Sequence, residues 1–145
     1  MESKNLPASG FRVLNIFLVE CEFFREMNIS FEPEKKTTNA EVDSSYESGD
    51  NQITITLTLN YSSSNIGGKN EITAYIKMLG IFEKYGENPV ALEDFGKING
   101  PAILFPFLRE QLASLSLKAG VGAILLPPIN FVKKAAEQKE KVKKA

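Results

Sequence analysis

The sequence contains no histidine and no tryptophan, and Cys21 is its only cysteine. The lack of histidine excludes serine triads, cysteine–histidine dyads and most catalytic zinc sites. A single cysteine excludes a disulfide within the chain, which is typical of proteins from a reducing compartment. We therefore expect no catalytic residue, no metal site and no cofactor, and we predict that the protein is not an enzyme.

Long apolar runs are missing as well. No segment approaches the length of a membrane span, so direct insertion into a membrane is not expected. Residues 1–10 lack the basic start and the long apolar core of a signal peptide. With the single cysteine, these features predict a cytoplasmic protein.

The net charge of -1 conceals an uneven distribution. Residues 133–145 carry six lysines and two glutamates, a charge of +4, which leaves -5 for the preceding residues. An acidic body argues against nucleic acid as a partner, because phosphate binding needs a basic patch on the folded part. The basic end could touch acidic lipid or nucleic acid, but alternating Lys and Glu is more typical of a solvated helix. At 145 residues with 43% apolar content, residues 1–145 are expected to form one domain.

Three features suggest chemistry only weakly. Glu20 and Glu22 share a face of a strand, as acid–base or metal sites require, but an exposed acidic edge is the more plausible interpretation. The segment 66–69 resembles a phosphate loop, yet Asn70 stands where magnesium binding needs Ser or Thr, which favours a flexible hairpin loop. Cys21 has no adjacent base and is interpreted as a small core or interface residue.

Four segments are predicted to be antiparallel strands. The clearest alternates apolar residues with threonine over residues 53–61, which indicates one buried face and one hydroxyl-lined face. Residues 40–47 form a weaker strand and residues 71–82 a further one. Residues 11–24 are apolar on both faces, so we expect both faces to be covered.

A long helix is predicted from Asn99, a plausible N-cap, to Ala119. Its apolar stripe contains Leu104, Leu108, Leu112 and Leu115 at helical spacing. A second flank of small or polar residues is expected to meet another close neighbour, and it consists of Arg109, Ala113 and Ser116.

Gly120 fits a left-handed cap just past this helix. The next segment, to Phe131, is apolar but broken by Pro127 and Pro128, which predicts an extended crossover. A short helix entered through Pro89 should precede the long helix, and a C-terminal helix should follow the crossover. The fold class is therefore α+β, with a four-stranded antiparallel sheet followed by a long helix, the crossover and a C-terminal helix.

The motifs LFPFLREQLASL and PPINF, joined by a glycine-containing apolar crossover, resemble the most distinctive region of the SecB export chaperones. GFRVLNIFLVECEF near the start and GIF at residues 80–82 are weaker but colinear matches. The resemblance implies an ATP-independent holdase that binds unfolded polypeptides during protein export, and a homotetramer built as a dimer of dimers. It implies one interface through Val13, Phe17 and Val19, and another through the flank of the long helix.

Several apolar side chains surround the long helix and the crossover. They are either core residues or, as we interpret them, the walls of a client groove, whose apolar contacts need no fixed hydrogen-bond geometry. The predicted groove residues are Ile81, Phe82, Phe105, Phe107, Val121, Ile124, Leu125, Leu126, Ile129 and Phe131.

The family resemblance also implies docking of the SecA motor on acidic residues of the sheet. Glu20 occupies one such position, but Phe24 and Tyr75 stand where carboxylates are expected, and the chain's end is basic. We therefore expect weakened or altered docking. Two alternatives remain: a SecB-like chaperone dedicated to the antitoxin of a toxin–antitoxin system, and a small-ligand-binding protein or enzyme using the same pocket.

Overall fold

The computed structural model describes residues 10–144, with side chains to residue 137. Its strands are β1 (Gly10–Arg25), β2 (Thr37–Ser48), β3 (Gln52–Ser64) and β4 (Asn70–Tyr85). They form one antiparallel sheet in the order β1-β4-β3-β2. The α+β fold predicted from the sequence is confirmed.

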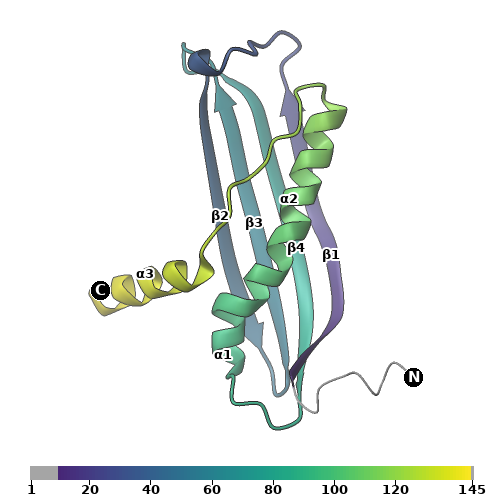
Figure 1. The fold of residues 1–145 in the computed structure, drawn as a ribbon, viewed down its shortest axis with the longest axis vertical. Coiled ribbons are helices and arrows are strands. Elements are labelled where there is room, and N and C mark those ends of the chain that lie inside the picture. The colour runs from purple at the N-terminus through teal and green to yellow at the C-terminus, as the bar shows by residue number, and fades with distance from the viewer. Residues whose placement is uncertain (1–9, 145) are drawn as a thin grey trace.

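The strand order places β1 and β2 at opposite edges of the sheet. The connection between them, residues 26–36, must therefore cross the end of the sheet, and it includes a short 3-10 helix at Pro33–Lys35 (Figure 1). The sequence predicted a connection here, but not that it spans the other two strands.

One face of the sheet carries the long helix α2 (Gly100–Lys118), as Figure 1 shows. The core lies between them, because alternate residues of β3 and β4 point at the helix. Ile53, Ile55, Leu57 and Leu59 are fully buried, whereas the threonines between them are half-buried on the other face. The period-two prediction for this strand is confirmed. We call the face opposite α2 the outer face.

The start of the long helix differs from the prediction. A short helix, α1 (Leu92–Asp94), runs through a π-helical turn (Phe95–Asn99) directly into α2. Asn99 therefore has helical dihedrals, φ -70° and ψ -45°, and its side chain makes no capping bond. The N-cap prediction is wrong because the helix already begins seven residues earlier, at Leu92. Gly100 permits close packing here, since a Cβ atom would lie 1.8 Å from Cδ1 of Ile55.

The end of α2 is as predicted. Gly120 has a φ of +73°, and the backbone N–H groups of Gly120 and Val121 donate to the carbonyls of Leu117 and Ser116. These two bonds define a Schellman motif. The crossover then runs across β3 and β2 to α3 (Phe131–Lys144), which extends away from the sheet (Figure 1). Within the described part of the chain, no helix combines the length and the apolarity that crossing a membrane requires.

Candidate functional site

Four of the ten predicted groove residues belong to the core. Phe82 is 0% exposed and packs edge-on against Phe95, with ring centroids 5.1 Å apart. Phe105 and Phe131 bury each other in a similar contact at 5.9 Å, and Leu126 is buried beside them in the same cluster. The expectation that these side chains line an open groove is corrected. Phe105, Leu126 and Phe131 anchor the crossover and α3 to α2, whereas Phe82 packs between β4 and the π-helical turn.

The other six residues are accessible, but not on one surface. Ile124 and Ile129 are half-buried against the core. Val121, at the start of the crossover, is also half-buried. Ile81 pairs with Thr54 and lies on the outer face, away from the crossover. The structure therefore separates Ile81 from the rest of the predicted set.

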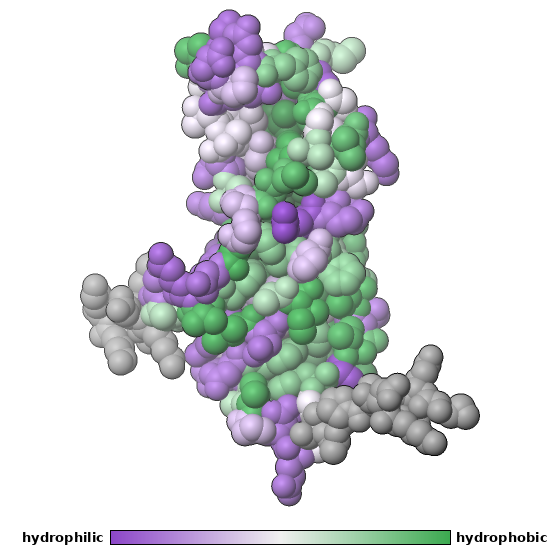
Figure 2. Space-filling model, viewed as in Figure 1, coloured by the Kyte–Doolittle hydropathy of each residue, from purple (hydrophilic) through white to green (hydrophobic). Residues whose placement is uncertain are grey.

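The most exposed members of the set lie on the helix-bearing side. Leu125 in the crossover is 67% exposed, and Phe107 lies on the exposed flank of α2. Figure 2 shows hydrophobic residues gathered on this side of the molecule, over α2 and in the upper part of the view. A partly open apolar surface thus remains, although it is smaller than the sequence predicted.

Arg25 joins two segments that the sequence analysis did not connect. Its Nη1 donates to the carbonyl of Ala119 at 2.6 Å, and its Nη2 donates to the carbonyl of Met27 at 2.8 Å. One guanidinium therefore holds the β1–β2 connection against the C-terminal end of α2. The cation also lies where the helix dipole favours positive charge.

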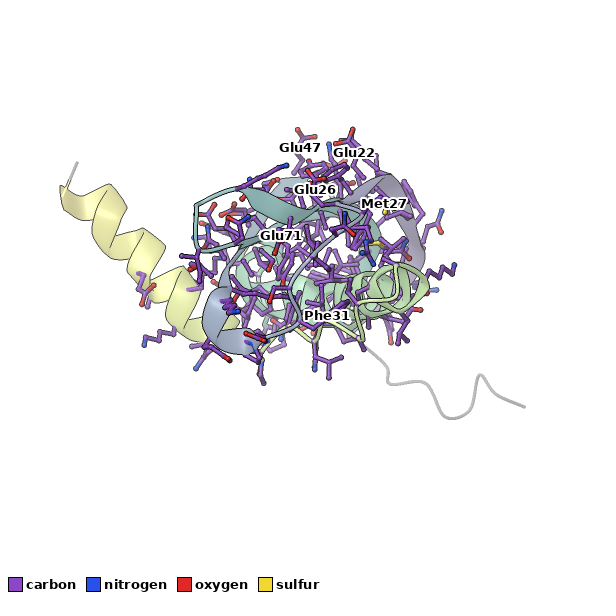
Figure 3. The ribbon with its side chains drawn as sticks, turned by 90° about the horizontal axis from the view of Figure 1, so that it is seen from above. Glu22, Glu26, Met27, Phe31, Glu47 and Glu71 are labelled. Carbon is purple, nitrogen blue, oxygen red and sulfur yellow. The ribbon has the colours of Figure 1, made fainter. Side chains whose placement is uncertain are left out.

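Exposed apolar side chains surround this junction, and we call them the end patch. Met27 is 88% exposed, and Phe31, from the same connection, and Leu117, from α2, are also exposed. Figure 3 places Phe31 on the side of the sheet that carries α2. The end patch consists of these three exposed side chains and of Val121, which is half-buried beside them in the chain after Gly120. The sequence analysis included Val121 alone, because isolated apolar residues in a polar connection give little signal.

Ser116 fixes the crossover to α2. It is fully buried, its hydroxyl donates to the carbonyl of Leu112 at 2.8 Å, and it accepts the backbone N–H of Ile124, also at 2.8 Å. Its predicted role in a subunit interface is wrong, because the side chain is enclosed within its own chain. Arg109 and Ala113 remain half-buried at the surface, with the Arg109 guanidinium 5.9 Å from the Phe105 ring.

The exposed edge of β1 is apolar. Val13, Phe17 and Val19, the predicted interface residues, are 39–51% exposed, and Leu14 and Leu18 are exposed beside them. The register to β4 shifts twice along this stretch. β2, at the other edge, carries polar and acidic side chains, and Lys134 of α3 donates to its Val42 carbonyl. Charged residues discourage strand pairing at an edge, so β1 is the better edge for a second chain.

Glu20 lies on the outer face, directly opposite Lys77 in the register. Phe24 on the same strand is half exposed, and Tyr75 is half-buried. The predicted docking position is therefore accessible, but its surroundings are aromatic and carry a lysine.

Among the residues that the structure describes, two ionisable groups have clearly shifted pKa values. Burial raises the pKa of the Tyr61 hydroxyl, and the hydrogen bond with the Ser63 side chain opposes that shift. The hydrogen bond with Glu93, at 2.7 Å, raises the pKa of the Lys97 ammonium. Within the described residues, no cluster of His, Cys, Asp and Glu is arranged to hold a metal ion.

The fold is shared with a protein of known structure. The chain is similar in structure to the Mycobacterium tuberculosis Rv1957 SecB-like chaperone, solved in complex with a ChAD peptide from the Rv1956 HigA1 antitoxin. The TM-score is 0.69 at 14% identity, covering 83% of this chain and 91% of the other. The fold is therefore that of a SecB-like protein.

Similarity in sequence assigns the chain to a family. The family described as preprotein translocase subunit SecB matches residues 9–141, and the chain belongs to this family. It is 34% identical to the protein-export protein SecB of Halorhodospira halophila over 96 residues, which cover 64% of this chain but about half, 53%, of that protein. It is 29% identical to the SecB of Thioalkalivibrio sulfidiphilus over 138 residues, covering 91% of this chain and 80% of the relative.

Proposed function

We propose that this protein is an ATP-independent chaperone that holds non-native polypeptides for protein export in the cytoplasm. The single observation that supports this most is the exposure of the end patch and of Leu125 in a SecB-family chain. We call the end patch and Leu125 together the client surface, of which Phe31, Leu117 and Leu125 lie on the helix-bearing side. Apolar side chains on irregular backbone bind by burial of surface and without a fixed hydrogen-bond pattern. The function requires no enzymatic step and no cofactor.

The proposed assembly is a homotetramer, a dimer of dimers. The apolar edge of β1 supports one contact. The flank of α2 that carries the half-buried Arg109 and Ala113 supports the second. Both surfaces lie outside the end patch, so assembly leaves that patch open.

Suppression of aggregation tests the proposal. The tetramer, mixed with an unrelated unfolding protein, should delay light scattering at stoichiometric amounts. The double variant Leu117→Ser, Leu125→Ser should lose most of this protection, because removing two exposed apolar side chains forfeits about 1.5–3 kcal/mol each when they are buried by a client. Both residues are exposed, so the fold should be retained, unlike that of a Phe105 variant.

Val90→Ser is the matched control, since Val90 is an exposed apolar residue just before α1, at the other end of α2. It should protect as well as the original protein. Equal protection by the double variant and the control, with both variants folded by circular dichroism, would remove the support for the client surface.

We also propose that coupling to a SecA-type motor is weak or altered. Lys77 opposite Glu20, and the aromatic Phe24 and Tyr75, reduce the acidity of the expected docking position. Calorimetric titration with the C-terminal zinc peptide of such a motor should show no tight binding at physiological salt. A sub-micromolar affinity would contradict this.

A dedicated antitoxin chaperone is the second candidate, because the Mycobacterium tuberculosis protein of this fold was solved with an antitoxin peptide. This candidate predicts tight binding to one antitoxin and no effect on generic unfolded clients. The aggregation assay described above therefore distinguishes the two functions.

A further inference from the structure

The outer face of the sheet is hollowed near the end crossed by the β1–β2 connection. The hollow has a volume of about 520 Å³ and receives residues from all four strands. Small-molecule sites occupy roughly 300–1,000 Å³, so the hollow is large enough for a small ligand. It lies on the side of the sheet opposite the proposed client surface.

One row of residues crosses the whole sheet through this hollow. Glu22 of β1 pairs with Tyr75 of β4, Tyr75 with Asn60 of β3, and Asn60 with Glu41 of β2. The row therefore begins and ends with a carboxylate, and an aromatic ring and an amide lie between them. Three strand spacings put the Cα atoms of Glu22 and Glu41 about 14 Å apart.

The neighbouring row supplies the rest of the floor. Phe24 pairs with Thr73, Thr73 with Ser62, and Ser62 with Asn39. All four line the hollow, and among the described residues no lysine or arginine does so. The floor thus offers hydroxyl and amide oxygens and two aromatic rings, all of which interact favourably with alkylammonium groups.

We propose that this hollow binds a linear polyamine, with one terminal ammonium at Glu22 and the other at Glu41. The methylene chain lies over Tyr75 and Phe24, and an internal ammonium group is hydrogen-bonded by Asn60 and Thr73. Charge complementarity supports this occupant, since both ends of the hollow are anionic. The wide separation of the carboxylates disfavours a single metal ion, which needs its ligands converging on one point.

The nearest cation on this face belongs to the next row. Lys77 lies opposite Glu20 in the register and does not line the hollow. It should weaken binding modestly by repulsion, and Lys77→Gln should therefore tighten it. The proposal is independent of the chaperone function, because the client surface lies on the opposite face.

Diamines of equal charge and different length test the proposal. In the full-length protein at low salt, diaminodecane should shift the amide NMR signals of Asn60 and Tyr75, and so should spermine, a linear polyamine of higher charge. Diaminobutane, which is too short to reach both carboxylates, should bind about fivefold more weakly, the factor expected from losing one exposed ion pair. Glu22→Gln and Glu41→Gln should each remove this dependence on length.

Glu47→Gln is the matched control, because Glu47 is an exposed carboxylate on the same outer side as Glu22, as Figure 3 shows, but does not line the hollow. It should leave the length dependence unchanged. Affinity that follows charge alone, or shifts spread over all acidic residues, would overturn the proposal. So would binding of oligolysine at the hollow without any binding of the diamines.

Discussion

Single side chains hold the irregular parts of this chain in place. The crossover has few polar side chains, so its backbone groups must find partners elsewhere. Ser116 supplies one by accepting the N–H of Ile124. A serine in the middle of a helix usually bonds back to its own helix, and Ser116 does this as well as reaching the neighbouring segment.

Ser116→Ala should destabilise the chain by about 1–3 kcal/mol, because it leaves the N–H of Ile124 without its acceptor. Urea unfolding measures the loss, and hydrogen exchange at Ile124 should accelerate. Ser114→Ala, two residues earlier in the same helix and half exposed, should change stability by less than about 0.5 kcal/mol. If the two variants were equally stable, the hydroxyl would not be what holds the crossover.

Most of the helices and strands follow from local sequence pattern. Alternation in β3, the proline and glycine positions of the crossover and the stripe of α2 predicted the elements observed. The false N-cap at Asn99 arose because a π-helical turn continues the helix without any sequence signal. The end patch could not be predicted, because the exposure of Met27 depends on strand order, which brings distant segments together. For the same reason hydrophobicity alone could not separate buried Phe82 from exposed Phe107.

Arg25 connects three parts of the chain: β1, the β1–β2 connection and the C-terminal end of α2. Its substitution should therefore destabilise all three. Arg25→Met keeps an unbranched apolar stem but removes the hydrogen bonds to Glu26, Met27 and Ala119. We expect a loss of about 2–3 kcal/mol, since bonds from a charged donor are the stronger kind. Hydrogen exchange should increase in residues 26–36 and in the last turn of α2.

Arg12→Met is the matched control on the same strand. Arg12 is more exposed, lies 3.7 Å from Glu83 and stacks over the Tyr85 ring at 4.4 Å. Exposed pairs contribute at most about 1 kcal/mol, so this variant should stay close to the original stability. A comparable loss in both variants would argue against a special role for Arg25.

The two edges of the sheet differ in the side chains that they present. β1 presents Val13, Phe17 and Val19, whereas β2 is polar and is contacted by Lys134. An apolar edge strand left open is prone to uncontrolled pairing, which a specific partner prevents. This asymmetry is the main structural support for the proposed dimer contact.

Val19→Lys should shift the assembly toward smaller species, because a charge at the apolar edge opposes pairing. Sedimentation velocity at micromolar concentration measures the shift. Ser45→Lys, on exposed β2, should leave the assembly unchanged. An unchanged distribution for Val19→Lys would place the dimer contact elsewhere.

The pairing of β1 with β4 also determines when the sheet can form during synthesis of the chain. Gly10 pairs with Tyr85, so β1 leaves the ribosome well before β4, the strand that hydrogen-bonds to it, has been translated. During that interval both edges of an apolar strand are free on the nascent chain. Neighbouring ribosomes on one message could then bring two such strands together, so that subunits meet before either has finished folding.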